Sequence, residues 1–482
     1  MTTAKTSRNW ARPKKFDNNI IVIGGGSAGL VTTYIAAAVK AKVTLIEKHK
    51  MGGDCLNTGC VPSKALISTT RLLANAARSK EFGIANMTAD FSFSDVMERV
   101  QAVVKAIEPH DSVERYQSLG VDVIEGNARI LSPWEVEVTT MTGTQTLTTL
   151  SIVIAAGARP LVPPIPGIEN IAYLTSDTVW NLRTQPKRLI VLGGGPIGCE
   201  LAQCFGRLGS NVTIVEMASR LLIREDEDAS GLVLDQFKNE GINVLLGHTA
   251  KQFTAENGEK NLLVEHEGNT ISIPFDAILL ALGRTPNTSG YGLEDIGVEL
   301  SPKRTVQIDG FQATNFPNIF ACGDVSGPYQ FTHTAAHQAW YAAVNALFGN
   351  IKKFRTDYSV IPWATFTEPE VARVGLNELE ARELGIKYET SIYDIADLDR
   401  AIADGNAHGF VKVLTKPGTD KILGVTIVGN HAGDLIAEFV LAMKHGIGLN
   451  KILGTIHIYP TLAEANKYVA GVWKKNHQPH KL

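Results

Sequence analysis

The sequence predicts an α/β protein, because one pattern of strand, glycine turn, helix and strand occurs in it twice. The second strand of each copy ends in an acid, Glu47 or Glu216, that lies 23 residues after the first glycine of its turn, Gly24 or Gly193. Short apolar strands that alternate with helices are typical of parallel α/β sheets. From Pro362 onward strands and helices continue without a glycine turn, which predicts a separate C-terminal α+β domain.

Each glycine turn has the spacing Gly-x-Gly-x-x-Gly between a strand and a helix, which predicts a Rossmann-like dinucleotide-binding site. Glycines there let the backbone approach a pyrophosphate, the helix N-terminus offers N–H groups, and the acid can accept ribose hydroxyls. A lone glycine pattern is weak evidence, but the strand, the helix and the acid around it make it specific. The expected cofactor-binding residues are Gly24, Gly26, Ser27, Gly29, Glu47 and Lys48 in the first copy and Gly193, Gly195, Gly198 and Glu216 in the second.

A different pattern, Gly-Gly-Asp-Cys-Leu-Asn-Thr-Gly-Cys-Val-Pro-Ser-Lys, occupies residues 52–64 and holds two of the five cysteines, Cys55 and Cys60. Residues five positions apart in an ideal helix lie roughly 8–9 Å apart, whereas a disulfide needs Cα atoms within about 7 Å. The two cysteines can therefore pair only across an irregular turn, which Gly53 and Gly59 permit. We interpret them as a reactive dithiol or disulfide; two buried small side chains, or half of a zinc site, are the alternatives. No metal site is expected, because no histidine cluster follows at ligand spacing and the other cysteine pair falls inside a predicted helix.

Cys199 and Cys204 repeat this spacing inside the predicted helix of the second copy, from about Pro196 to Leu208. The same distance argument predicts that they do not form a disulfide. Packing within the helix is the better interpretation of this second pair.

Composition narrows the possible partners. The 46 basic and 49 acidic residues give a net charge of −3, which argues against nucleic acid as a partner. Five cysteines in 482 residues form no secreted disulfide framework and suit a reducing compartment.

A basic N-terminus followed by the uncharged run 20–39 is superficially like a membrane anchor, but three glycines at 24–26 split the run. We therefore expect a disordered basic tail at 1–18, no membrane contact and a cytoplasmic location.

Further candidate cofactor contacts lie where predicted strands end. One strand closes on Ala156-Gly157 before a proline-rich junction, and a matching strand closes on Gly283. Another ends in Gly323-Asp324, whose acid can bind the polyol of a cofactor. Gly53 and Asp54, beside the first cysteine, complete this set of candidates.

Together these residues resemble the flavin-dependent pyridine nucleotide–disulfide oxidoreductases, the family of dihydrolipoamide dehydrogenase, glutathione reductase and mercuric reductase. The resemblance covers nearly the whole chain and includes the cysteine segment, both glycine turns, Gly283-Arg284, Gly323-Asp324, and Tyr459-Pro460-Thr461 with Glu464. It implies that the first turn binds FAD and the second NAD(P)H. The implied domains are an FAD-binding domain at 19–160 and 290–360, an NAD-binding domain at 161–289 and a dimerisation domain at 361–482. A homodimer is implied, in which the dimerisation domain completes the partner's active site.

The resemblance also implies catalytic roles. Cys60 would be the thiol that faces the flavin, and Cys55 the interchange thiol that attacks substrate. Lys64, paired with Glu200, would lie near the flavin, where a cation stabilises the reduced ring, and a buried lysine needs such a carboxylate. Electrons would pass from the nicotinamide through FAD to the disulfide and on to a small-molecule or protein-bound thiol or disulfide substrate, or in reverse.

One departure concerns Tyr459, which stands where the disulfide-exchanging members have histidine. A phenol with a pKa of about 10 does not readily shuttle protons at neutral pH, whereas an imidazole near about 6.5 does. We expect the Tyr459 hydroxyl to donate to Glu464, with His457 as the alternative base. Mercuric reductases are similar in having tyrosine there, but they carry a C-terminal cysteine pair that this sequence lacks.

Three function classes follow from these observations. The first is a dihydrolipoamide-dehydrogenase-like dithiol or disulfide oxidoreductase, and the second is a metal-ion or quinone reductase with the same core. The third, a non-catalytic flavoprotein, is disfavoured because both cysteines, Lys64 and Glu200 are present. Glu216 predicts NAD rather than NADP, since a carboxylate repels a 2′-phosphate, and Arg220 nearby is the counter-argument.

Overall fold

The computed structural model describes residues 10–256 and 258–478. The chain divides into two compact units. The first contains the chain up to Pro62, Gln101–Arg159 and Arg284–Thr356, and the second contains Ser63–Val100, Pro160–Gly283 and the chain from Asp357 onward. The further division of the second unit into a nicotinamide-binding and a dimerisation domain stays a prediction.

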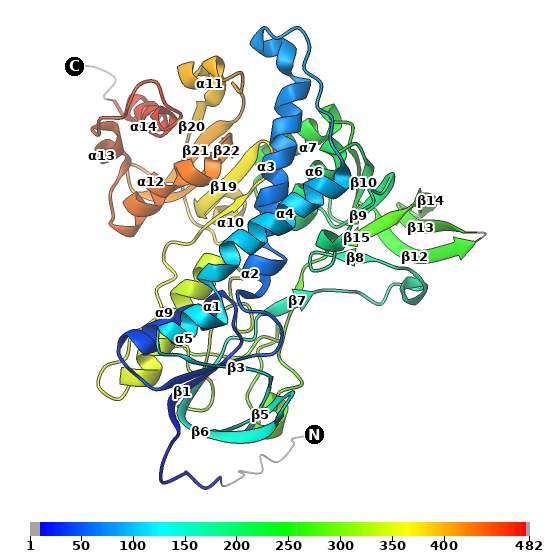
Figure 1. The fold of residues 1–482 in the computed structure, drawn as a ribbon. Helices are drawn as coiled ribbons and strands as arrows, with labels where there is room; N and C mark the ends of the chain where they lie inside the picture. The colour runs from blue at the N-terminus through cyan, green and yellow to red at the C-terminus, as the bar shows by residue number, and fades with distance from the viewer. Residues whose placement is uncertain (1–9, 257, 479–482) are drawn as a thin grey trace. The chain divides into compact units, whose positions relative to one another are not determined.

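The first unit is built on a sheet with the strand order β3-β2-β1-β6-β5-β4, in which β17 also pairs with β6. Figure 1 labels β1, β3, β5 and β6 of this sheet. The C-terminal part of β6 runs parallel to β1 and β17, and its N-terminal part runs antiparallel to β5. The apolar residues of β1 are almost fully buried, as expected for a parallel strand that is covered on both faces. The helices and strands are β1 (Asn18–Ile23), α1 (Ser27–Ala38), β2 (Val43–Glu47), α2 (Gly53–Asn57), α5 (Val113–Ser118), β3 (Asp122–Glu125), β4 (Asn127–Ser132), β5 (Glu135–Thr140), β6 (Gly143–Ile154), β7 (Ala158–Pro160), β16 (Arg284–Pro286), α8 (Leu293–Ile296), β17 (Ile319–Ala321) and α9 (Thr332–Phe348).

Two helices, α3 (Cys60–Ala77) and α4 (Phe93–Ile107), belong partly to each unit. The second unit contains the other copy of the repeat, in a parallel sheet with the order β11-β10-β9-β15-β8. An antiparallel sheet of β12, β13 and β14 is inserted before β15. The elements of this part are β8 (Leu174–Thr175), β9 (Arg188–Leu192), α6 (Pro196–Arg207), β10 (Asn211–Glu216), α7 (Glu227–Asn239), β11 (Asn243–Leu246), β12 (Thr249–Glu256), β13 (Glu259–His266), β14 (Asn269–Phe275) and β15 (Ala277–Leu280).

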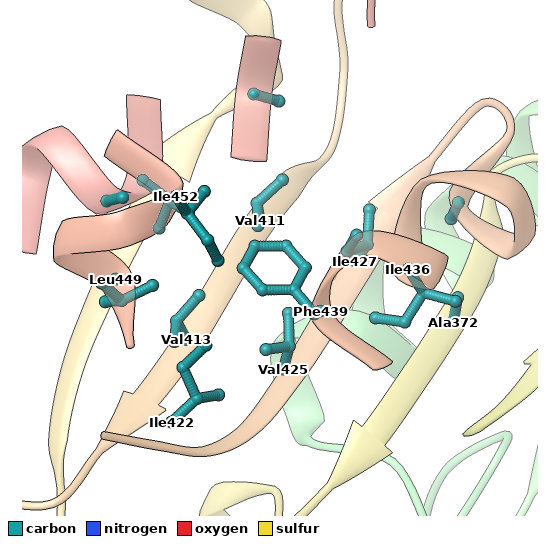
Figure 2. Packing of buried hydrophobic residues seen from close by; sticks show 14 of the residues in the cluster. Ala372, Val411, Val413, Ile422, Val425, Ile427, Ile436, Phe439, Leu449 and Ile452 are labelled. Atoms are coloured by element: carbon teal, nitrogen blue, oxygen red, sulfur yellow. The ribbon is translucent and has the colours of Figure 1, made fainter. Parts of the chain in front are cut away.

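The C-terminal part of the second unit is an antiparallel sheet, β18-β19-β22-β21-β20, with helices packed on it. Figure 2 shows the ring of Phe439 from α12 between Val411 and Val425 of the sheet, all three fully buried. Burying such a side chain contributes roughly 1.5–3 kcal/mol, so this cluster anchors the helix to the sheet. The elements are β18 (Pro362–Thr365), β19 (Glu370–Gly375), α10 (Glu378–Glu383), β20 (Glu389–Asp394), α11 (Asp399–Ala403), β21 (Phe410–Thr415), β22 (Ile422–Gly429), α12 (Ala432–Lys444), α13 (Leu449–Leu453) and α14 (Glu464–Asn476).

The prediction of a disordered tail at 1–18 is wrong for its second half, while residues 1–9 lie outside the described part of the chain. The ring of Trp10 packs edge-on against Phe316 with a centroid distance of 5.8 Å. The Asp17 carboxylate accepts hydrogen bonds from the backbone N–H and the hydroxyl of Thr148, at 2.9 and 2.8 Å. An aromatic contact and a carboxylate tied to β6 hold this segment, although its basic composition suggested otherwise.

The uncharged run at 20–39 forms β1, the glycine turn and α1 rather than one helix. Over residues 10–256 and 258–478, no helix is both long enough and apolar enough to span a membrane.

Candidate active site

The two cysteines of the 52–64 segment lie on either side of a helix break. Cys55 belongs to α2, Cys60 is the first residue of α3, and Thr58 and Gly59 separate the helices. The structure holds the cysteines as two thiols, with Cys55 half-buried, Cys60 exposed and a hydrogen bond between them. That hydrogen bond and burial raise the pKa of Cys55 well above its ordinary value. The irregular turn expected from the spacing is therefore present.

Glycines and one amide shape the entry to this segment. Gly52 and Gly53 adopt left-handed backbone angles, with φ of 85° and 56°, which an L side chain rarely adopts. The Asn57 side-chain amide donates to the carbonyls of Met51 and Gly53, both at 2.9 Å. A Cβ on Gly53 would lie 2.6 Å from the Cα of Gly26 in the first glycine turn. The cysteine segment and the glycine turn thus pack directly on one another.

In both glycine turns the outer glycines face the chain itself. The middle glycine of the second turn, Gly195, faces open space, whereas that of the first turn, Gly26, faces Gly53 at contact distance. A Cβ on Gly24 or Gly29 would overlap backbone carbonyls, and the same holds for Gly193 and Gly198. A Cβ on Gly195 would meet no atom within 4 Å. The first and third glycines are therefore required by packing, and the space above Gly195 fits a pyrophosphate at the helix N-terminus.

The acid at the end of the second strand turns back toward its glycine turn in both copies. Glu47 accepts hydrogen bonds from the backbone N–H groups of Gly25 at 2.5 Å and His49 at 2.7 Å. Glu216 accepts from Gly194 at 2.6 Å and Ala218 at 2.7 Å. Each carboxylate oxygen keeps lone pairs for further donors, so both residues fit the hydroxyls of a ribose.

Arg220, the counter-argument to NAD, is bound elsewhere. Its Nη2 donates to the carbonyl oxygens of Ile223 at 2.9 Å and Glu225 at 3.2 Å. The guanidinium is therefore held by its own loop rather than by Glu216.

Three charged residues join the cysteine segment to the strand end at Gly323-Asp324. The Arg284 guanidinium forms an ion pair with Asp54, lies 3.4 Å from the Asp324 carboxylate and donates to the Ala158 carbonyl at 2.9 Å. Burial raises the pKa of Asp324, which the positive charge of Arg284 partly offsets. The sequence reasoning named Arg284 only as part of a motif; nothing in the order of residues placed it beside Asp54.

The remaining candidate cofactor residues line the ends of strands. The Ala156 carbonyl accepts from the Asn287 side chain at 2.9 Å, and the Gly323 N–H donates to Gln338 at 2.6 Å. Lys48 is exposed beyond β2, and Ser27 begins α1. Gly157 and Gly283 both adopt positive φ next to their strand ends.

Lys64 and Glu200 pair as expected. The Lys64 ammonium lies 2.9 Å from Glu200 Oε2 and 4.2 Å from the ring centroid of Phe366. Glu200 is buried, and its other oxygen accepts the Phe366 backbone N–H at 2.9 Å. The Lys64 ammonium thus lies between a carboxylate and an aromatic face, while its side chain remains partly exposed. Glu200 is thus a buried acid with two partners rather than a solvent-exposed acid on the surface of α6.

The expected hydrogen bond from Tyr459 to Glu464 is absent, and both side chains have other partners. The Tyr459 hydroxyl donates to Asp399 Oδ2 at 2.9 Å, and this bond raises the pKa of Tyr459. Glu464 is buried at the start of α14, where it accepts from the Thr461 backbone at 3.2 Å and the Tyr468 hydroxyl at 3.1 Å. Glu464 accepts hydrogen bonds at the start of its own helix, while Tyr459 lies on an exposed loop. No pattern in the sequence indicated Asp399 or Tyr468.

His457, the alternative base, is occupied at both ring nitrogens. Its Nδ1 lies 3.0 Å from the Thr455 carbonyl and its Nε2 lies 2.9 Å from Glu438 Oε1. Both partners, a backbone carbonyl and a carboxylate, offer oxygen acceptors to the ring. The Asn466 amide donates to the other Glu438 oxygen at 2.9 Å. His457 is thus built into a fixed network rather than presented to a substrate.

A cavity of about 280 Å³ in the C-terminal part of the chain includes Asp399, the hydrogen-bond partner of Tyr459, in its lining. Its lining residues are Tyr393, Asp397, Leu398, Asp399, Glu464 and Tyr468. Burial and the surrounding negative charge raise the pKa of Tyr393 to about 12. Among the described residues, no group of three or more histidine, cysteine or acidic side chains is arranged to hold a metal ion.

Family models match almost the whole chain. Residues 18–339 match the model of the pyridine nucleotide-disulphide oxidoreductases, and residues 361–470 match that of the dimerisation domain of the same enzymes. Among curated relatives, a dihydrolipoyl dehydrogenase of Chlamydia muridarum is 34% identical over 92% of this chain and 94% of its own length. A mercuric reductase of Lysinibacillus sphaericus is 34% identical over 95% of this chain and 83% of its own length.

Solved structures give the same result. The copper(II) complex of RclA, an HOCl-induced flavoprotein disulfide reductase of Escherichia coli, aligns with a TM-score of 0.84 and 27% identity over 94% of this chain and 99% of that one. LpdA of Mycobacterium tuberculosis aligns with a TM-score of 0.85 and 27% identity over 94% of this chain and 99% of that one. The relatives thus differ in their named substrates while sharing one architecture.

Proposed function

Because the chain belongs to the pyridine nucleotide-disulphide oxidoreductase family, we propose that it passes electrons between NAD(H), FAD and the Cys55–Cys60 pair. The observation that carries this proposal is the arrangement of the two thiols: hydrogen-bonded to each other, across a helix break, and packed against the first glycine turn. Bound FAD would supply the chemistry that converts hydride transfer into two-electron reduction of the disulfide. FAD belongs at the turn that begins at Gly24, and NAD(H) at the turn that begins at Gly193.

The side chains around the pair have matching tasks. Lys64, held by Glu200, provides a fixed positive charge one helical turn beyond Cys60 on α3. With FAD bound, Cys60 would be the thiol that faces the flavin, and Cys55, whose pKa is raised, would hold a proton until it attacks a substrate. Arg284 fixes Asp324 for the polyol of the cofactor and Asp54 for the position of the cysteine segment.

We propose that the functional form is a homodimer. The chain carries the family's dimerisation domain, and next to Tyr459 two large apolar side chains are almost fully exposed, Ile456 at 95% and Ile458 at 77%. Apolar groups exposed in this way mark interaction sites. In such a dimer the 456–460 loop brings Tyr459 to the partner's cysteine pair.

The proposed substrate is a dithiol or disulfide of the dihydrolipoamide type, small or protein-borne. A metal-ion or quinone acceptor is the second candidate, and Tyr459 favours it: its hydroxyl is bound to Asp399 and its pKa is raised, so it does not serve as a neutral-pH base. Reduction of a bound metal ion needs no thiol–disulfide proton shuttle.

Steady-state assays decide between the two. Purified protein is supplied with NADH or NAD⁺ against dihydrolipoamide, glutathione disulfide, Hg(II) and quinones. The dithiol proposal predicts the highest kcat/KM with dihydrolipoamide, and a higher value with Hg(II) or a quinone would replace it by the second candidate. Protein that binds no FAD and reduces none of these acceptors would contradict both.

A further inference from the structure

One hydroxyl group lies against the two cysteine sulfurs from a segment far along the chain. Thr332, the first residue of α9, places its Oγ1 3.3 Å from the Sγ of Cys60. It also forms a hydrogen bond with Cys55 that lowers the pKa of this thiol, against the stronger influences that raise it. Thr332 was not among the residues expected from the sequence, because no motif connects position 332 with the segment 52–64.

The place of Thr332 in its helix leaves its hydroxyl available to sulfur. A threonine inside a helix commonly bonds the carbonyl three or four residues earlier, as Thr334 does with Phe331 at 2.9 Å. Thr332 begins the helix, and its hydroxyl reaches Cys60 instead. A hydroxyl can accept from a thiol or donate to a thiolate, and donation to the charged form is the stronger bond.

The surroundings of the two sulfurs are unequal. Cys55 is half-buried, and the Cys60 hydrogen bond, burial and the negative charges of Cys60 and Asp111 all oppose its ionisation. Cys60 is exposed and begins α3, and its Thr332 contact lies at the first residue of α9, so two helix N-termini meet at this sulfur. Helix N-termini favour negative charge.

We propose that Thr332 is a positioning residue that fixes the negative charge of the reduced pair on Cys60 rather than on Cys55. Two-electron reduction breaks the S–S bond and takes up one proton, which Cys55 holds, while the Thr332 hydroxyl donates to the Cys60 thiolate. With dithiothreitol as reductant, its two thiols form a disulfide and release two protons, one to Cys55 and one to solvent. The inference rests on the proposed function only in that Cys55 and Cys60 form a redox pair.

The test compares Thr332→Val, which keeps the shape and removes the hydroxyl, with Thr332→Ser, which keeps the hydroxyl. The flavin-containing protein is reduced with dithiothreitol, freed of reductant under anaerobic conditions and alkylated with iodoacetamide over a range of pH. Mass spectrometry assigns the label to Cys55 or Cys60. We expect the midpoint pH of Cys60 labelling to rise by about one unit in Thr332→Val, the typical effect of a hydrogen bond to a charged group. Thr332→Ser should keep the wild-type midpoint.

Thr334→Val is the matched control, since it removes a hydroxyl from the same turn that bonds Phe331 and should leave the midpoint unchanged. An unshifted midpoint in Thr332→Val, or equal shifts in the valine and serine variants, would overturn the inference. If valine disturbs the start of α9, Thr332→Ala gives the same comparison with the same two outcomes. If Cys55 and Cys60 of the wild-type protein form no disulfide that dithiothreitol can reduce, both the proposed function and the proposed role of Thr332 are contradicted.

Discussion

Two cysteine pairs with the same spacing occupy opposite environments in this chain. Cys55 and Cys60 lie across the break between α2 and α3, one half-buried and one exposed. Cys199 and Cys204 lie inside α6, both fully buried, and burial raises the pKa of Cys204 to about 12. The Cys199 thiol donates to the nearby Gly194 carbonyl, and the Cys204 sulfur accepts from the hydroxyl of Thr70, 134 residues away in the chain. Backbone conformation and burial, rather than spacing, therefore distinguish the proposed redox pair from the buried pair.

The two glycine turns have the same geometry, but the chain segments that follow them differ. After Glu47 the chain enters the cysteine segment, which packs Gly53 against Gly26. After Glu216 it enters the loop in which Arg220 bonds to backbone carbonyls. A duplicated scaffold thus binds two dinucleotides under the proposed function, while only the first copy adds a reactive pair.

The largest expected effect separates the two cysteine pairs directly. Cys55→Ser or Cys60→Ser should lower NADH-dependent turnover of the physiological acceptor by on the order of 10³-fold or more, because the covalent route is lost. Cys199→Ala and Cys204→Ala should leave turnover nearly intact, since a buried cysteine behaves as a small apolar residue. Steady-state rates of the four variants measure this.

The single substitutions also test the order of the two thiols. Partly reduced protein should show a long-wavelength absorption from a thiolate against the flavin, which Cys60→Ser abolishes and Cys55→Ser retains without reductant. A band that survives in Cys60→Ser would reverse the assignment.

Reactivity toward alkylation should differ by about 10²-fold or more between the pairs. The thiolate is the nucleophile, and at pH 8 a thiol whose pKa is raised to about 12 by burial is almost entirely protonated, as for Cys204. Iodoacetamide should therefore label Cys60 in the reduced native protein, and label Cys199 and Cys204 only after denaturation. Peptide mass spectrometry over a time course gives the rates, and equal labelling of all four in the native state would contradict the comparison.

The second glycine turn should discriminate between the nicotinamide cofactors by about 10²-fold in kcat/KM in favour of NADH. A 2′-phosphate beside the Glu216 carboxylate places like charges together, which costs several kcal/mol. Glu216→Gln should narrow this ratio, with Glu47→Gln in the first copy as the matched control. A higher kcat/KM with NADPH in the wild type would show that Arg220 leaves its backbone partners to bind the phosphate.

Features that repeat locally could be predicted from the sequence, and features that join distant segments could not. The strands, glycine turns and helices around Glu47 and Glu216 and the helix break at Cys55–Cys60 were anticipated from local patterns. The Lys64–Glu200 pair joins distant segments, and it was expected from the family resemblance rather than from the order of residues. Arg284, Thr332 and Asp399 were missed as site residues, because each acts on a segment more than fifty residues away. The tail at 10–18 was misjudged because one tryptophan contact outweighed its basic composition.

The smallest expected effect, about tenfold in turnover, concerns position 459, where a tyrosine stands in place of an acid–base group for the proposed cysteine pair. Thiol–disulfide interchange needs a base to form the attacking thiolate and an acid for the departing one, and such groups typically contribute about 10²–10⁴-fold. The hydrogen bond to Asp399 raises the pKa of Tyr459, so this phenol stays protonated at neutral pH. Turnover of free dihydrolipoamide or glutathione disulfide should be low near pH 7 and rise toward alkaline pH as the attacking thiol, of dihydrolipoamide or of the enzyme, ionises.

Tyr459→His should therefore raise thiol–disulfide turnover near pH 7 by at least about tenfold. The gain should be smaller than that from a fully positioned base, because Glu464 already accepts hydrogen bonds from Thr461 and Tyr468 and does not orient the new imidazole. Reduction of the flavin by NADH, measured by stopped flow, should be unchanged, since that half-reaction does not use position 459. His457→Ala is the control, and it should change turnover little because Glu438 and Thr455 hold both ring nitrogens. Rapid wild-type turnover of dihydrolipoamide at pH 7 that disappears in His457→Ala would instead identify His457 as the base, and would require the Glu438 contact to open during catalysis.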